Sequence, residues 1–405
     1  MSKPKIRFKG FIEDWEQRKL SDCAGFRRGS FPQPYGNKDW YDGEGAMPFV
    51  QVADVSNDMK LVNDTKQKIS KLAQPMSVFA EEGSVLVTLQ GSIGRVAITQ
   101  YGAFVDRTVL IFDKYEDGID KRFWAYIIKE KFEDEARKAP GGTIKTITKE
   151  VLSEFDLMLP SYAEQRKLAD YLISLDHLIT LHQRKYEEMK KFKKCMLQKM
   201  FPQNGKNIPE IRFEGFTEDW EQRKLGDILE RRVEQRQQSE EYPRLAFASG
   251  QGVIPLSERR TNNREQLIKD EFTKKYLVTE MDDIVYNPAN VKYGAIDRNK
   301  CGRGLISPIY VTFTTNEISG FIERIVTSHD FQQKALRFEE GTVTKRQSVN
   351  PEDFITIDIV VAPQREEQKK ISDYFDQLDH LITLHQRKYE ELQKIKKFML
   401  QNMFI

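Results

Sequence analysis

The sequence predicts an α+β protein: two mixed α/β domains joined by two long helices, which pack as an antiparallel coiled coil with pseudo-two-fold symmetry. Three observations lead to this fold. The chain has 405 residues, enough for two or three domains. A short segment and a long helical segment each occur twice. The stretches between the copies are hardly alike, so the chain alternates constant and variable segments.

The short constant segment opens the chain. Residues 6–20 return as residues 211–225 with 13 of 15 positions identical, and both copies end in Trp-Glu-Gln-Arg-Lys-Leu. We therefore place an N-terminal constant segment at 1–21. A linker followed by the second copy of that segment is placed at 202–226.

The variable segments, residues 22–162 and 227–363, are expected to be mixed α/β domains. Short β-branched and aromatic runs between turn residues predict strands, and a 3.6-residue apolar period predicts helices. The expected elements are strands at 47–52, 84–88, 105–112, 284–286 and 309–313, and helices at 120–138 and near 331–338.

The long constant segment is expected to be helical. Residues 164–201 return as 367–404 with 27 of 38 positions identical, and neither copy contains Pro or Gly. Apolar residues recur at heptad positions a and d, and each helix would be about 57 Å long at ~1.5 Å per residue. Helices at 163–201 and 364–405 are therefore expected to pack on each other. A separate amphipathic helix on each domain is the alternative.

The order of the segments also makes a prediction about the chain ends. Phe201 is followed closely by Ile211, whereas the equivalent Phe404 and Ile6 lie near opposite ends of the chain. The two ends are therefore expected to sit together, which closes two equivalent halves.

Because the helices are the part that repeats, they are expected to bind a repeated partner. His182 and His385 stand at a positions, where a polar residue can specify register. The candidate partner-binding residues are Leu175, Leu178, His182, Tyr186, Leu378, Leu381, His385 and Tyr389.

The sequence predicts no catalytic residue and no metal site. Residues 286–290, Tyr-Asn-Pro-Ala-Asn, are similar to the Asn-Pro-Pro-aromatic motif of adenine methyltransferases but lack its second Pro and its aromatic residue. His177 and His182 are five residues apart, which does not set two ligands on one helix face. There is no phosphate-binding Gly-Lys-Ser/Thr loop and no serine nucleophile elbow.

Polar and basic residues on expected loops are candidates for DNA binding. Arg, Asn and Gln can contact base edges, while Ser and Lys hold phosphates. Taken singly, each such residue is more often a solvated surface side chain. The candidates are Gln90, Ser92, Arg95, Arg107 and Lys145 in the first domain and Asn287, Asn290, Lys292, Arg298, Lys345 and Arg346 in the second.

Over essentially its whole length the chain resembles the specificity subunits of type I restriction–modification enzymes. The resemblance is carried by the duplicated order of several short motifs. They are Trp15 to Leu20, Gly91-Ser92-Ile93-Gly94, Leu159-Pro160 before Glu164 to Leu168, and Pro363 with Glu367-Gln368. The second domain departs from the Gly-Ser-Ile-Gly pattern, having Asn290-Val291-Lys292-Tyr293-Gly294, so its way of holding DNA is expected to differ.

The resemblance implies a non-catalytic DNA-specificity subunit. Each variable domain would read half of a split, asymmetric target in double-stranded DNA. The helices would set the gap and dock two methyltransferase subunits. Those partners would bind S-adenosylmethionine and methylate adenine, and a restriction–translocase subunit would use ATP and Mg²⁺. Two alternatives remain: an enzyme in its own right, and a two-armed structural or regulatory protein that bridges DNA.

Charge and composition bound the function further. Residues 22–160 carry a net charge of −3, residues 227–362 carry −2, and the rest of the chain carries +7. DNA binding depends on neutralising phosphates, so these domains are expected to bind DNA only through local basic grooves. Three scattered cysteines, with no apolar signal segment and no apolar run of membrane-spanning length, predict a soluble cytoplasmic protein.

Overall fold

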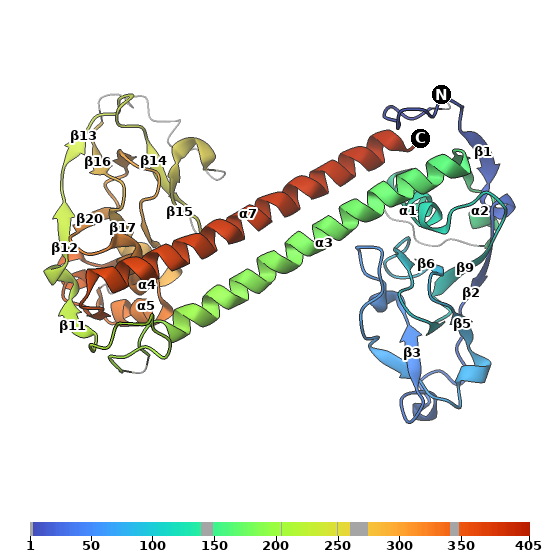
Figure 1. Cartoon of the computed structure of the whole chain (residues 1–405), viewed down its shortest axis with the longest axis horizontal. Helices are drawn as coiled ribbons and strands as arrows, with labels where there is room; N and C mark the ends of the chain where they lie inside the picture. The colour runs from blue at the N-terminus through green and yellow to red at the C-terminus, as the bar shows by residue number, and fades with distance from the viewer. Residues whose placement is uncertain (1–2, 139–148, 204, 249, 260–273, 341–347) are drawn as a thin grey trace. The chain divides into compact units, whose positions relative to one another are not determined.

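A computed structural model describes residues 3–138, 149–203, 205–248, 250–259, 274–340 and 348–405. The chain divides into two compact units. Unit 1 comprises Met1–Gln183 with Gln386–Ile405, and unit 2 comprises Arg184–His385. Each unit therefore contains one variable domain, half of each long helix and one copy of the short constant segment (Figure 1).

The helices and strands alternate along both variable domains. In the first domain and the helix after it they are β1 (Glu16–Lys19), β2 (Ala24–Arg28), β3 (Met47–Val50), β4 (Gln67–Ile69), β5 (Val78–Ala80), β6 (Val85–Thr88), β7 (Val96–Ile98), β8 (Ala103–Val105), β9 (Val109–Tyr115), α1 (Lys121–Lys138), α2 (Lys149–Ser153), β10 (Asp156–Leu159) and α3 (Tyr162–Lys199).

The second half follows a related order. Its elements are β11 (Glu221–Lys224), β12 (Leu229–Arg232), β13 (Gln235–Arg236), β14 (Leu245–Ala248), β15 (Gly252–Pro255), β16 (Tyr276–Thr279), β17 (Ile284–Tyr286), β18 (Ile296–Arg298), β19 (Gly304–Ile306), β20 (Val311–Thr315), α4 (Ser319–Val326), α5 (His329–Leu336), β21 (Glu339–Glu340), β22 (Ser348–Val349), α6 (Pro351–Phe354), β23 (Asp358–Val361) and α7 (Arg365–Met403).

The short constant segment forms the same strand pair in both units. β1 runs antiparallel to β10 with Glu16 opposite Leu159, and β11 runs antiparallel to β23 with Glu221 opposite Val361. The tryptophan before each strand is buried, as is the leucine after it, while the four polar residues between them are exposed or half-buried. The repeated Trp-Glu-Gln-Arg-Lys-Leu sequence therefore encodes an edge strand anchored at both ends.

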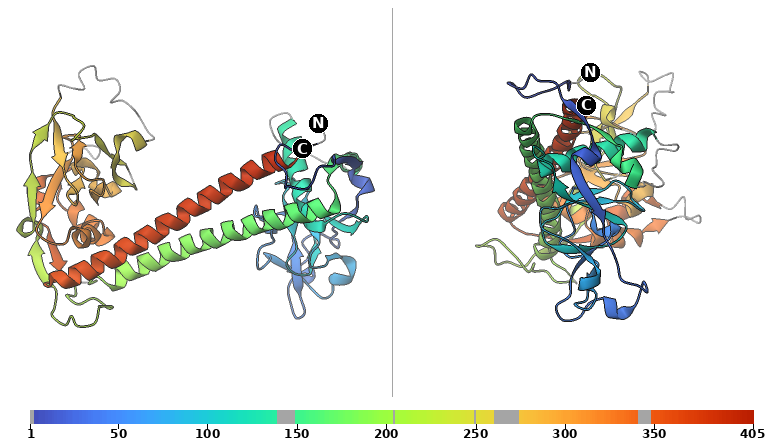
Figure 2. Two further views of the ribbon diagram at one scale, coloured as in Figure 1. Left: turned by 45° about the horizontal axis from the view of Figure 1, so that its top comes forward. Right: turned by 90° about the vertical axis from the view of Figure 1, so that its right-hand side faces the viewer.

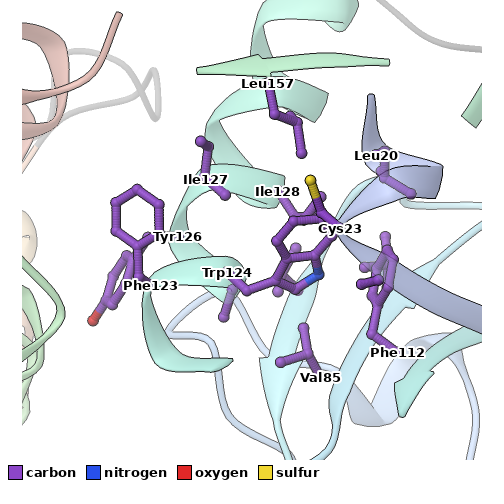
Figure 3. Packing of buried hydrophobic residues seen from close by; sticks show 14 of the residues in the cluster. Leu20, Cys23, Val85, Phe112, Phe123, Trp124, Tyr126, Ile127, Ile128 and Leu157 are labelled. Carbon is purple, nitrogen blue, oxygen red and sulfur yellow. The ribbon is translucent and has the colours of Figure 1, made fainter. Parts of the chain in front are cut away.

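Each variable domain is built on an equivalent antiparallel sheet. The strand order is β2-β9-β6-β7 in unit 1 and β12-β20-β17-β18 in unit 2. In unit 1, α1 covers this sheet and inserts Trp124, which is fully buried near Leu20, Cys23, Val85 and Phe112 (Figure 3). Burying this aromatic side chain removes a large apolar area from water, which is the main favourable contribution to folding.

The outer parts of the two domains differ. Unit 1 has a second four-stranded sheet, β4-β3-β8-β5, in which β3 and β8 are parallel. Unit 2 has a three-stranded sheet, β13-β16-β19, and a separate hairpin of β14 and β15. The divergence seen in the sequence is therefore concentrated in the outer sheets.

Most of the expected elements are present, but one strand was wrong. The strand expected at 105–112 is split between β8 and β9 by a turn at Asp106–Thr108. The Asp106 carboxylate accepts hydrogen bonds from the Thr108 backbone N–H (2.9 Å) and hydroxyl (2.5 Å), which closes the turn. The strand expected at 309–313 begins two residues later, at Val311, and Ile309 is exposed.

The long helices pair in opposite directions within each unit. In unit 1 the first half of α3 lies beside the second half of α7, and Lys396 forms an ion pair with Asp176 at 2.5 Å (Figures 1 and 2). In unit 2 the other two halves pair in the same way through Lys193 and Asp379. The expected antiparallel pairing is therefore confirmed in each unit.

The prediction about the chain ends is also confirmed. In unit 1 the Ile6 backbone N–H donates to the Asn402 carbonyl at 2.9 Å, which brings the two ends of the chain together (Figure 2). In unit 2 the Ile211 N–H donates to the Lys199 carbonyl at 2.9 Å. These are equivalent positions of the repeat. Each bond forms a junction between a long helix and a short constant segment: in unit 2 the chain is continuous across the junction, and in unit 1 the junction joins the N-terminal and C-terminal segments.

A buried arginine–glutamate pair holds each junction. The Arg7 guanidinium donates two hydrogen bonds of 2.7 Å to the Glu164 carboxylate, whose side chain is 1% exposed. Arg212 makes the same bidentate contact with Glu367, at 2.6 and 2.8 Å. Each pair ties the short constant segment to the first turn of a long helix.

We expect Glu164→Gln to lower the free energy of unfolding by about 3 kcal/mol, because it leaves the Arg7 charge without its carboxylate. Urea denaturation of the full chain measures this loss. The matched control is Glu188→Gln, which breaks the exposed Arg184–Glu188 pair on the same helix and should cause no measurable change. Equal effects of the two substitutions would contradict the structural importance of the junction.

Candidate functional site

The loop between β6 and β7 is the best-defined candidate contact in unit 1. It is tied to the buried Thr88, whose hydroxyl accepts from the Arg95 N–H (3.0 Å) and donates to the Ser92 carbonyl. The Thr88 carbonyl also accepts from the Gly94 N–H at 2.9 Å. These bonds fix the loop while leaving the side chains of Gln90 and Ser92 exposed.

Gly94 lets this loop approach helix α1 closely. Its φ is +82°, and a Cβ there would lie 2.8 Å from the Cβ of Phe132. Arg95 follows directly and is half-buried, with one guanidinium nitrogen 3.3 Å from the Val55 carbonyl. The small residues and the fixed backbone therefore leave Gln90 and Ser92 as the exposed polar side chains of this loop, which would allow DNA to approach it closely.

The first domain has two further candidates, Arg107 and Lys145. Arg107 is exposed in the turn between β8 and β9, and its guanidinium lies 5.5 Å from the ring centre of Tyr35. Lys145 lies outside the described residues. The Leu89 N–H donates to the Thr108 carbonyl at 2.8 Å, so the turn that carries Arg107 lies beside the start of the β6–β7 loop.

In unit 2, Asn287 has a structural task. It is 8% exposed, and its side-chain oxygen accepts from the Ala289 N–H at 3.0 Å, which caps the short helix Pro288–Tyr293. Asn290 is exposed on this helix, at a kink, and Lys292 belongs to the same helix. The segment occupies the place of the Gly-Ser-Ile-Gly loop but has a different backbone.

Arg298 is already held by carboxylates. Its guanidinium forms ion pairs with Glu323 (2.7 Å), Asp376 (2.9 Å) and Asp282 (3.1 Å) and is 12% exposed. This arrangement favours a role in joining β18 to α4 and α7 over contact with DNA. Lys345 and Arg346 lie outside the described residues.

Stacked arginine–tyrosine groups in unit 2 were missed by the sequence reasoning. The guanidinium groups of Arg236 and Arg303 lie 4.7 and 5.3 Å from the ring centre of Tyr242. Arg244 stacks on Tyr276 at 3.5 Å. The short spacing in Arg236, Tyr242 and Arg244 was the only available signal, because Arg303 and Tyr276 join the group through sheet pairing. Both tyrosines are buried, and Arg236 and Arg303 are also paired with glutamates, so these groups favour a role in holding the outer sheet together.

The candidate partner residues on the helices divide by exposure. Leu175 and Leu378 are buried in the cores, which favours a packing role for both. Leu178 and Leu381 are 40% and 37% exposed, and Leu181 and Leu384, which were not singled out, are 38% and 43% exposed. His182, Tyr186, His385 and Tyr389 are half-buried.

The exposed leucines occur at equivalent positions of the repeat. Leu178 and Leu181 belong to unit 1, and Leu381 and Leu384 belong to unit 2. Residues three apart on a helix lie on one face, so each unit presents the same apolar pair. The sequence signal was the i, i+3 spacing within a run that is identical in both copies.

The described part of the chain has neither a cluster of metal ligands nor a membrane-spanning helix. Across the described residues, no group of three or more His, Cys, Asp or Glu side chains is placed to hold a metal ion. Nor does any helix within the described ranges have the length and apolar character needed to cross a membrane.

Known proteins share both the sequence pattern and the fold. Residues 12–191 match the family model described as the type I restriction modification DNA specificity domain. The MjaVIII specificity subunit of Methanocaldococcus jannaschii is 22% identical, covering 95% of this chain and 91% of its own. The putative MjaX specificity subunit of that organism is 23% identical with the same coverage.

The fold is also similar to that of a solved structure along the whole chain. The S subunit of a type I restriction–modification system from M. genitalium superposes with a TM-score of 0.66 at 15% identity. The match covers 100% of this chain and 99% of that one. It shows that the two proteins share a fold.

Gly94→Ala should lower the free energy of unfolding by about 2–4 kcal/mol, because the methyl group adds a clash with Phe132 to the strain of a positive φ. Gly91→Ala is the control in the same loop. Its φ is +64°, but a Cβ there meets only Val52 Cγ1, at 3.6 Å, so about 1 kcal/mol is expected. Thermal unfolding of both variants compares them, and equal losses would mean that close approach to α1 is unimportant.

Proposed function

We propose that this chain is a DNA-specificity subunit of the type I restriction–modification family and that each variable domain reads one half of a split, asymmetric DNA target. The observation that carries the proposal is the combination of an equivalent framework with unlike outer parts. Both domains rest on the same strand pair and the same four-stranded sheet order. Their outer sheets and contact loops differ, as two readers of different base sequences would.

In this proposal the two domains hold DNA through different chemistry. The first uses the fixed loop that carries Gln90 and Ser92, together with Arg107. The second uses Asn290 and Lys292 on its short helix. Base discrimination would come from Gln, Asn and Arg, which can form bidentate contacts with purine edges.

The charges imply that DNA affinity is shared with other subunits. Net charges of −3 and −2 on residues 22–160 and 227–362 give little attraction to a polyanion. We therefore propose that partner subunits supply most of the phosphate contacts, while this chain supplies the base contacts. Methyl transfer from S-adenosylmethionine, and DNA cleavage with ATP and Mg²⁺, belong to those partners in the proposal.

The exposed leucine pairs are the proposed docking points for two methyltransferase subunits. Equivalent residues on equivalent helix faces would bind two copies of the same protein, because the same apolar surface is presented twice. A helix face of this kind fits an amphipathic helix of the partner. The length of the helices would then set the gap between the two half-sites.

Replacing residues 22–160 by the chain's own residues 227–362 tests the division of the target. Both segments end in a strand that pairs with the same constant strand, so the graft keeps the framework. We expect the complex to methylate a sequence that contains the second half-site twice and lacks the first. Sequencing of methylated adenines in a host genome measures this. Loss of both half-sites with normal complex assembly would count against the modular proposal.

Leu178→Glu with Leu181→Glu should remove one methyltransferase copy per chain, and Leu381→Glu with Leu384→Glu should remove the other, because each pair puts charge into an apolar contact. Native mass spectrometry at saturating methyltransferase counts the copies. Gln183→Glu and Gln386→Glu, on the opposite side of each helix, are matched controls that should keep two copies. Wild-type binding of one copy, or of none, would refute the stoichiometry, and the second result would favour a DNA-bridging protein.

A further inference from the structure

A groove of about 950 Å³ lies in unit 2 and takes no part in the DNA contacts proposed above. It runs between the C-terminal end of α3, the chain that follows it, α5 and β23. Its floor is apolar and includes Leu197, Phe201, Phe331 and Ile359. The volume is in the range of sites that bind a ligand or a segment of polypeptide.

The rim of this groove is strongly basic. Seven lysines and arginines line it against two aspartates. One of the two, Asp379, is already neutralised by ion pairs with Lys193 and Arg324. Lys194, Lys206, Lys334 and Arg337 therefore surround an apolar floor with an excess of positive charge.

The repeat builds a counterpart groove in unit 1, but its described lining has no excess of positive charge. Leu400, Gln401 and Phe404 of α7 and the chain end take the places of Leu197, Gln198 and Phe201. This groove is smaller, about 430 Å³. Three carboxylates line it, Glu130, Asp134 and Asp156, against two basic side chains.

The reason for the difference is that the two sides of each groove have different origins. The constant helix supplies one wall in both units, and the variable domain supplies the other. In unit 1 that second wall is α1, where burial and the nearby Glu133 raise the pKa of Glu130 to about 7. In unit 2 it is α5 and the residues beside it, which bring Lys334 and Arg337.

We propose that the unit 2 groove binds an acidic, amphipathic segment of another subunit of the complex, one segment per chain. An apolar floor inside a basic rim matches a polypeptide with apolar residues on one face and carboxylates beside them. A DNA backbone would use the positive charge but would leave the apolar floor without a partner. The proposal rests on the proposed function only in taking the partner from the same complex.

The one-per-chain stoichiometry follows from the charge difference. An acidic segment is attracted to unit 2, whereas in unit 1 Asp134 is paired with Arg137 and Asp156 with Lys19, so the counterpart offers no excess of positive charge. The two methyltransferase copies bind equivalent surfaces, whereas this groove distinguishes one end of the chain from the other. The unit 2 groove would therefore bind one acidic segment per chain, although the chain has two equivalent methyltransferase sites.

Photo-cross-linking in the assembled complex on DNA tests the proposal. A benzoylphenylalanine replaces Gln198, which is exposed at the groove, and in a separate variant replaces the equivalent Gln401 in unit 1. We expect a cross-link from position 198 to one acidic protein segment, identified by mass spectrometry, and none from position 401 to that segment. Cross-linking to DNA alone, no cross-link from 198, or equal cross-links from both positions would each overturn the proposal.

Charge reversal supplies a second readout. Lys194→Glu with Lys334→Glu should reduce the cross-link from position 198 at least tenfold, whereas Lys397→Glu, the equivalent of Lys194 in the other copy, should leave it unchanged. Methyltransferase stoichiometry and the methylated sequence are measured on the same variants. If these stay normal while the cross-link persists, the groove proposal fails and the proposed function stands. If the complex without the charge reversals does not bind two methyltransferase copies or does not methylate a split sequence, the proposed function fails, whatever the cross-link shows.

Discussion

The structure depends first on a buried arginine–glutamate pair that appears twice. Arg7 with Glu164, and Arg212 with Glu367, join each short constant segment to the start of a long helix. Removing either partner would leave a charge without compensation, so the geometry of each junction is narrowly specified. The strand pairs β1·β10 and β11·β23, and the backbone bonds of Ile6 and Ile211, follow from this placement.

The helices meet the variable domains through an aspartate that is the same in both copies. Asp176 accepts from the Tyr126 hydroxyl at 2.6 Å, and Asp379 pairs with Arg324 at 2.9 Å. A lysine of the opposite helix completes each site. Tyr126 and Arg324 come from domains that are otherwise unlike, so each domain has its own means of satisfying one fixed carboxylate. This separation lets a domain change its outer sheets without disturbing the helices.

That separation has a functional consequence. The constant parts carry the net positive charge and the equivalent exposed leucines, whereas the variable parts carry the loops proposed to contact DNA. Partner binding can therefore stay unchanged while DNA specificity changes. The grooves at the helix ends combine both kinds of segment, which is why their charge differs between the two units.

The sequence by itself determined the architecture, because heptad spacing and internal repeats can be read directly from the order of residues along the chain. It predicted two helices, the equivalence of the halves and the meeting of Ile6 with the end of α7. It could not separate buried from exposed members of one helix face, so Leu175 was grouped with Leu178, nor foresee that Arg298 would be held by three carboxylates. The sequence also did not predict the Arg–Tyr groups or the turn that separates β8 from β9. These features are set by tertiary structure, since burial and ion pairing depend on which distant residues folding brings within a few ångströms.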